Sequence, residues 1–253
     1  MLDTSVAATW IERWDRQQET FLTDREERFQ VIADVVETVA DRPDPLVVDL
    51  GCGPGSLSAR VLDRVPGAEV VGVDADPLLL GLAAAAYGHR RGLRFVDADL
   101  RRPGWTDVLA LTRRVDAVVS TTALHWLHED ELAATFRAVA GLLRPGGVFV
   151  DGDHFYDAAT TRLAALSRVV GDGVARRAGV VSDDTAWSTW WRDAEADPHL
   201  AELVASRAAR PLEHGDNTVD YADNLRLLTN AGFAESGTVW QHGADRVLVA
   251  AVA

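Results

Sequence analysis

Five short apolar runs alternate with helix-like segments between residues 46 and 153, and this alternation limits the fold more than any other feature of the sequence. The runs are rich in β-branched residues and nearly continuous in apolar character, as in strands buried on both faces of a parallel sheet. Strict alternation with helices predicts an α/β fold with a doubly wound sheet. The predicted strands are LVVDL (46–50), EVVGVD (69–74), LRFVDAD (93–99), VDAVVST (115–121) and GVFVDGD (147–153), and the predicted helices are 55–65, 76–88, 104–113 and 130–143.

The segments on either side of this alternation have a different pattern. Residues 5–40 have helical spacing, and 154–216 are helical in pattern without a strand. A helix near 218–231 precedes two strands, 233–241 and 246–252, whose tight connection predicts an antiparallel hairpin at the sheet edge. We therefore expect one domain, 1–253, composed of an N-terminal helical arm (1–42), a core (45–153), a helical lid insertion (154–216) and a C-terminal helix and hairpin (217–253).

Charge and residue usage exclude several classes of function. The chain has 39 acidic against 25 basic residues, a formal net charge of −14, whereas a protein that binds phosphates along a surface needs a positive stripe. We therefore expect neither nucleic acid nor a membrane surface as a partner. The sequence has no lysine, which excludes Schiff-base and P-loop chemistry. Cys52, the single cysteine, excludes an internal disulfide and thiolate zinc sites. No leader pattern or long apolar run is present, so we expect a cytoplasmic protein.

A glycine-rich loop follows the first predicted strand. Its pattern is Asp49-x-Gly51-x-Gly53-x-Gly55. The dinucleotide fingerprint would need its third glycine at position 56, which is Ser56. Glycines at a strand–helix junction bring backbone N–H groups and a helix N-terminus close to a ligand. Three spaced glycines exceed what a tight turn requires, so the loop predicts a ligand site that is not a nicotinamide dinucleotide site.

Acidic residues stand at the ends of the first three predicted strands. Asp74 ends the second strand, where a carboxylate can accept hydrogen bonds from both ribose hydroxyls of an adenosine. The alternative role for Asp74 is to cap the following helix, but Asp76, just before Pro77, could supply that N-cap instead. Asp99 ends the third strand, where its carboxylate could accept from an adenine amino group while the N–H of Leu100 meets a ring nitrogen. Together with Asp49, these acids predict an adenosine-containing ligand at the carboxyl edge of the sheet.

These motifs resemble those of the class I S-adenosylmethionine-dependent methyltransferases. VVDLGCGPG is similar to the family's first motif, and DADL, VDAVVSTTALHWL and LLRPGGVFV are similar to later ones. The resemblance implies a seven-stranded sheet of order 3-2-1-4-5-7-6 with the last strand antiparallel, S-adenosylmethionine as cofactor and S-adenosylhomocysteine as product. It also implies a cofactor site formed by Asp49, Gly51, Gly53, Gly55, Asp74, Ala75, Asp99, Leu100 and Thr121. Arg13, Gln18 and Arg25 of the arm could reach the carboxylate of the cofactor or an acidic acceptor. ALHW and the lid resemble the small-molecule branch around trans-aconitate, quinone and secondary-metabolite methyltransferases.

Residues near the ends of the fourth and fifth strands and in the lid are the candidates for the acceptor site. His154 is the first candidate for a general base, because the turn after strand five faces the methyl group in this fold and imidazole titrates near neutral pH. His125 is the second, with helix capping or packing as its alternative. Residues that could contact the acceptor are Trp126, Tyr156, Trp187, Trp191 and His214, although the tryptophans could simply pack a lid. The spacing of these histidines predicts no metal site.

The function expected from the sequence is methyl transfer to an oxygen or nitrogen atom of a small molecule, in bacterial secondary metabolism. Alternatives are a non-methylating enzyme of the same fold, such as a cyclase, and a protein or nucleic-acid methyltransferase. No [DN]PPY motif follows the fourth strand, where STTALHW stands, which disfavours adenine amines as acceptors. The sequence does not define the acceptor or the oligomeric state.

Overall fold

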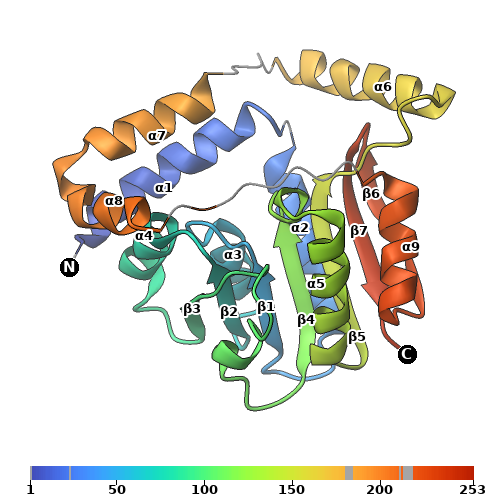
Figure 1. Ribbon diagram of the computed structural model, residues 1–253, viewed down its shortest axis with the longest axis horizontal. Helices are drawn as coiled ribbons and strands as arrows, with labels where there is room; N and C mark the ends of the chain where they lie inside the picture. Colours follow the sequence, from blue (N-terminus) through green and yellow to red (C-terminus); the bar gives the residue numbers. More distant parts are fainter. Residues whose placement is uncertain (1, 23, 180–184, 211, 213–218) are drawn as a thin grey trace.

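The structure, a computed structural model, describes residues 2–22, 24–179, 185–210, 212 and 219–253. Its centre is a seven-stranded sheet of order β3-β2-β1-β4-β5-β7-β6, as the resemblance implies (Figure 1). β7 is antiparallel to both of its neighbours, and the pairs among β1 to β5 are parallel. The strands are β1 (Leu46–Leu50), β2 (Glu69–Asp74), β3 (Leu93–Asp97), β4 (Val115–Thr121), β5 (Leu143–His154), β6 (Glu235–His242) and β7 (Asp245–Ala251).

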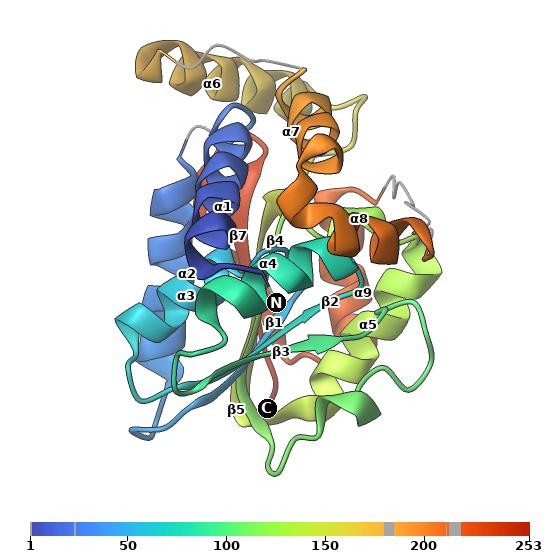
Figure 2. The same ribbon diagram turned by 90° about the vertical axis from the view of Figure 1, so that its left-hand side faces the viewer.

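Helices cover both faces of the sheet, as its apolar strands require. All five residues of β1 are buried, as expected for a central strand with helices above and below it. Figure 2 shows the sheet nearly edge-on, with α2 and α3 on one side and α5 and α9 on the other. The helices are α1 (Thr4–Glu19), α2 (Arg25–Val39), α3 (Ser56–Arg64), α4 (Pro77–Tyr87), α5 (Glu129–Leu142), α6 (Arg162–Ala178), α7 (Ala186–Ala196), α8 (Ala201–Ala208) and α9 (Tyr221–Ala231).

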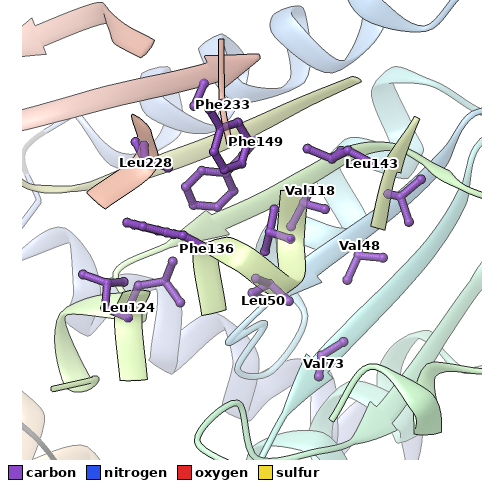
Figure 3. Packing of buried hydrophobic residues seen from close by; sticks show 14 of the residues in the cluster. Val48, Leu50, Val73, Val118, Leu124, Phe136, Leu143, Phe149, Leu228 and Phe233 are labelled. Carbon is purple, nitrogen blue, oxygen red and sulfur yellow. The ribbon is translucent and has the colours of Figure 1, made fainter. Parts of the chain in front are cut away.

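The larger core cluster lies between the sheet and the layer formed by α5 and α9. Phe136 of α5 and Phe149 of β5 meet with ring centroids 5.4 Å apart, and Phe233 follows at 6.2 Å from Phe149 (Figure 3). All three side chains are 4% exposed or less. Burying aromatic groups of this size contributes roughly 2–3 kcal/mol each, so these contacts stabilise the packing of α5 and of the segment after α9 against β5.

The N-terminal arm and the lid pack on each other at the carboxyl edge of the sheet. Figure 1 shows α1 beside α7, and α1 also contacts α4. Trp10 and Trp14 of α1 form one buried apolar cluster with Trp190 of α7. α6 lies apart from this cluster, near β6 and β7. Among the described residues, no helix has the length and apolar character needed to cross a membrane.

The helix expected over 104–113 is wrong, because only a 3₁₀ turn, Asp107–Leu109, forms there. Trp105 and Leu109 do enter the core at helical spacing. However, Gly104 has a φ of 79° and Ala110 a φ of 48°, and both values lie outside the helical region. The spacing of Trp105 and Leu109 therefore indicates that both side chains are buried, but it does not indicate a helix. β5 begins at Leu143, four residues before the predicted start, with a register irregularity opposite Val115 and Ala117.

Candidate active site

A pocket of about 560 Å³ lies at the carboxyl edge of the sheet, where the arm and the lid meet the strand ends. In a doubly wound sheet this edge is where ligands bind. The arm contributes Trp14, Gln18, Phe21, Leu22, Arg25 and Phe29, and the loop after β1 contributes Gly51, Cys52, Gly53, Pro54, Ser56 and Leu57. The end of β2, the segments that follow β2 and β3, and the first turn of α4 contribute Asp74, Ala75, Asp76, Leu79, Ala98, Asp99, Leu100 and Arg101. The rest of the wall is Thr121, Thr122, Ala123, His125, Trp126, Leu127, His154, Trp187, Trp191 and Leu212.

The glycine loop forms the floor of this pocket. Gly51 and Gly53 have φ values of 63° and 53°, a left-handed conformation that glycine adopts without strain. A Cβ on Gly51 would stand 2.3 Å from the Cβ of Ala123, so the close approach of the loop to the end of β4 requires glycine. Gly55 differs from the expectation: it is the N-cap of α3, next to Phe95, and does not line the pocket.

Two carboxylates lie under and beside the loop. Asp74 lines the pocket and accepts hydrogen bonds from the N–H groups of Gly53 at 2.7 Å and Asp76 at 2.8 Å. Burial raises its pKa to about 6. Asp49 is not on the wall but beneath the loop, 1% exposed, where Ser58 donates to its Oδ2 and burial raises its pKa to about 7. The other oxygen of Asp49, Oδ1, has no hydrogen-bond partner in the described structure.

The acids after β2 and β3 have separate tasks. Asp76 is the N-cap of α4, accepting from the N–H groups of Leu78 and Leu79, so Asp74 is not needed as a cap. Asp99 lines the pocket but is held by Arg101, whose Nε lies 2.9 Å from its Oδ1. Burial acts to raise the pKa of Asp99, but the hydrogen bonds and charge of Arg101 lower it overall.

The arm closes one side of the pocket. Arg25 is 6% exposed and pairs with Asp15 at 2.9 Å, and Gln18 lies on the same wall. Arg13, which the sequence also suggested, instead pairs with Asp193 outside the wall. Phe21 and Leu22, between α1 and α2, line the pocket although no sequence signal indicated them. Their contribution depends on how the arm folds back over the sheet.

Tryptophans from the arm and the lid build the roof. Trp14 meets Trp187 at 5.3 Å, Trp190 at 4.9 Å and Trp191 at 6.1 Å between ring centroids. Trp190 is buried in the cluster, whereas Trp14, Trp187 and Trp191 also face the pocket. The same side chains therefore hold the lid and form an aromatic wall.

Histidine and carboxylate side chains meet at the ends of β4 and β5. His125 Nδ1 lies 2.8 Å from Oδ2 and 3.0 Å from Oδ1 of Asp153. His154, the other candidate base, lines the pocket beside them, and burial lowers its pKa. Thr122, between β4 and His125, has a φ of 49°, a strained value for a β-branched residue. Such strain concentrates at functional sites.

Two predicted acceptor residues are not placed on the pocket wall. The Tyr156 side chain is 63% exposed and stacks on His154 at 6.1 Å, outside the pocket lining. His214 lies outside the described residues.

Comparison with known proteins identifies the family. A family model of a methyltransferase domain matches residues 47–147. Trans-aconitate 2-methyltransferase from Azoarcus sp. is 32% identical over 75% of this chain and 70% of its own length. The protein of the same name from Streptomyces avermitilis is 30% identical over 90% of this chain and 71% of its own length. The chain belongs to the class I S-adenosylmethionine-dependent methyltransferases.

Solved structures show that the fold of this methyltransferase extends over nearly all of the chain. Magnesium protoporphyrin IX methyltransferase from Synechocystis, solved with S-adenosylhomocysteine, aligns with a TM-score of 0.57 at 18% identity and covers 97% of this chain and 95% of its own. An O-methyltransferase family protein from Burkholderia thailandensis aligns with a TM-score of 0.57 over 97% of this chain and 70% of its own. These likenesses establish the fold alone.

The pocket of the methyltransferase fits S-adenosylmethionine. Beneath the loop, Asp49 Oδ1 is a buried acceptor without a partner in the described structure, as expected where a cationic group binds nearby. Gly51 and Gly53 line the pocket with backbone alone. Asp74 presents a carboxylate to the same volume.

Proposed function

We propose that this methyltransferase transfers the methyl group of S-adenosylmethionine to a small-molecule acceptor inside the pocket at the carboxyl edge of its sheet. One observation carries the proposal: a single continuous volume of about 560 Å³ joins the glycine loop and Asp74 to His125, His154 and the tryptophan roof. Volumes of this size suit a cofactor and a compact ligand. Methyl transfer is an in-line displacement, so holding both reactants in one volume supplies much of the catalysis.

The cofactor is assigned to the side of the pocket near β1, β2 and β3. We assign its ammonium group to Asp49, directly or through water, because Oδ1 of this buried carboxylate has no described partner. Asp74 is assigned to the ribose hydroxyls, since its carboxylate lines the pocket at the end of β2. The adenine is assigned to Asp99 and the N–H of Leu100, at the end of the neighbouring strand.

The remaining cofactor contacts come from the arm and from β4. Gln18 and Arg25 line the pocket on the arm side, and we assign them to the cofactor's carboxylate. The backbone around Gly51, Gly53 and Ala75 approaches the pocket without large side chains, and Thr121 closes it at the end of β4. When bound, the cofactor supplies an electrophilic methyl carbon on a sulfonium.

The acceptor is assigned to the opposite side, under the lid. Residues 154–216 include α7, whose Trp187 and Trp191 line the pocket, so we propose that this segment forms the acceptor wall. A roof built from the arm and the lid leaves room for a compact molecule and supports a small-molecule acceptor over a polymer. The acidic net charge of −14 likewise disfavours nucleic acid. A place in bacterial secondary metabolism remains part of this proposal.

Calorimetry with S-adenosylhomocysteine tests the assignment. Asp74→Asn removes the charge from the ribose position and is expected to weaken binding roughly 10-fold or more, because a hydrogen bond to a charged group contributes about 1.5–3 kcal/mol. The matched control is Asp97→Asn, which changes the same group at the end of β3 on an exposed side chain that pairs with Arg210. Equal binding by both variants, or saturable binding of NAD in place of S-adenosylhomocysteine, would reject the proposed function.

A further inference from the structure

The pair formed by His125 and Asp153 follows from the register of two neighbouring strands. β4 and β5 run parallel with Thr121 opposite Gly152, so the residues that follow them emerge side by side. Asp153 is 3% exposed, and both of its oxygens lie within 3.0 Å of His125 Nδ1. Its Oδ1 also accepts the N–H of His154 at 2.7 Å, which fixes the carboxylate in place.

A carboxylate at Nδ1 determines which nitrogen of the imidazole can accept a proton. Nδ1 must carry hydrogen to donate to Asp153, so the lone pair is on Nε2. Burial acts to raise the pKa of Asp153, but the charge and hydrogen bond of His125 hold it below its usual value. Asp151 is the neighbouring buried acid, and burial raises its pKa well above the usual range, so the negative charge resides on Asp153. Among the described residues, the other charged or titratable groups facing the pair include His154, Tyr156, Arg28 and Asp245.

On the described part of the wall, each arginine is paired with a carboxylate. Arg25 and Arg101 are the cationic side chains other than histidine on its described part, and the residues outside the described ranges include no lysine or arginine. Arg25 pairs with Asp15 and is assigned above to the cofactor's carboxylate, and Arg101 pairs with Asp99. A di- or tricarboxylate acceptor would therefore lose its hydration without meeting an arginine of the described wall that is not already paired with a carboxylate.

The opposite wall is aromatic. Trp14, Trp187 and Trp191 face the pocket from above, and Trp126 borders it near His125. Aromatic side chains of this kind pack against flat apolar molecules through offset or edge contacts. The acceptor side of the pocket thus combines an apolar surface with one oriented imidazole.

We propose that His125 is the general base of this methyltransferase, oriented by Asp153, and that its acceptor is an uncharged hydroxyl compound with a flat apolar body. The inference rests on the proposed function. In the step it describes, the hydroxyl oxygen forms a bond to the methyl carbon and the carbon–sulfur bond breaks with its electron pair passing to sulfur. The hydroxyl proton moves to Nε2 of His125, and Asp153 stabilises the imidazolium. A carboxylate acceptor, such as the one in the names of the relatives above, has no proton to lose and needs no base.

The test uses the whole protein with two probe sets: phenols and naphthols, and aliphatic di- and tricarboxylates that include trans-aconitate. We expect methylation within the first set. His125→Ala is expected to lower kcat roughly 100-fold or more, the usual contribution of a general base, and to abolish the rise of rate with pH. Added imidazole should restore part of the rate. Asp153→Asn should lower kcat by a similar factor with little change in KM, because it acts through His125.

Binding of S-adenosylhomocysteine, measured on every variant, separates this inference from the proposed function. It should stay within about 2-fold of wild type in His125→Ala and in the control His89→Ala, an exposed histidine away from the pocket. Lost binding in the wild-type protein would reject the proposed function itself. With binding intact, turnover of carboxylates, turnover of no hydroxyl compound, or an unchanged kcat and pH profile in His125→Ala would overturn the inference.

Discussion

Ionisation of Asp49 should oppose folding of the protein when no cofactor is bound. Its pKa is raised by burial to about 7, from an ordinary value of 3.8. The pKa of Asp49 is higher in the folded state than in the unfolded state, so the protonated carboxyl favours folding. This stabilisation is fully present below the unfolded pKa of 3.8 and is lost as the pH rises through the folded pKa of about 7. The shift of about 3 units corresponds to about 4 kcal/mol in all, of which about 2–3 kcal/mol falls between about pH 5 and pH 8.

Asp49→Asn keeps the shape of this side chain and removes its charge. Oδ1 of the new amide can still accept from Ser58, which now donates to the carboxylate. Between about pH 5 and pH 8, the free energy of unfolding should decrease less in the cofactor-free variant than in cofactor-free wild type. The two decreases should differ by about 2–3 kcal/mol. Because other buried acids titrate in both proteins, the difference between the two slopes reports Asp49.

Urea denaturation at the two pH values measures these slopes. Asp63→Asn is the control, since this carboxylate is 66% exposed and pairs with Arg90 on the surface. Asp49→Asn should also gain less stability than wild type from added S-adenosylhomocysteine, because it lacks the charge assigned to the ammonium group. If the free energy of unfolding had the same pH dependence in wild type and in Asp49→Asn, the claim that a buried carboxylate with a raised pKa lies beneath the loop would be refuted.

Three further variants or conditions give direct tests. Gly51→Ala should destabilise the protein by about 1–3 kcal/mol and abolish calorimetric binding of S-adenosylhomocysteine, because a φ of 63° and a Cβ 2.3 Å from that of Ala123 are compatible only with glycine. Binding as tight as in wild type would contradict this. Trp14→Ala should lower the free energy of unfolding by about 3–5 kcal/mol and speed proteolysis of the arm, because Trp14 contacts three tryptophans of the lid. An unchanged rate of proteolysis would show that these contacts do not hold the arm in place. Affinity for S-adenosylhomocysteine should fall as the pH drops below about 6, the pKa of Asp74, because the ionised carboxylate is the better hydrogen-bond acceptor. An affinity that does not change with pH in calorimetry would contradict this.

Local patterns in the sequence carry most of the fold. The β-branched runs predict the strands of the parallel sheet because strands buried on both faces must be continuously apolar. The spacing of Gly51 and Gly53 predicts the loop because its left-handed conformations need glycine. The segment 104–113 shows the limit of such patterns. Trp105 and Leu109 have helical spacing, but a turn between two positive φ values buries them equally well.

The acceptor side of the pocket depends on packing that no local pattern contains. Sequence reasoning named both His125 and His154 and favoured His154, whereas the register of β4 and β5 brings the buried Asp153 to the imidazole of His125. Phe21 and Leu22 reach the pocket only because the arm folds back over the sheet. The tryptophans of the lid were ambiguous between packing and binding, and the structure places Trp187 and Trp191 in both environments.

The central claim is that the pocket transfers methyl from S-adenosylmethionine to a small molecule. Its most direct test follows S-adenosylmethionine carrying a labelled methyl group in the presence of the phenol and naphthol set, with product and S-adenosylhomocysteine quantified together by mass spectrometry. The account predicts equal amounts of S-adenosylhomocysteine and of a singly methylated product, both lowered roughly 10-fold or more when Asp74→Asn replaces wild type at low cofactor concentration. Saturable cofactor binding without label in any small molecule, including the carboxylates, would contradict it.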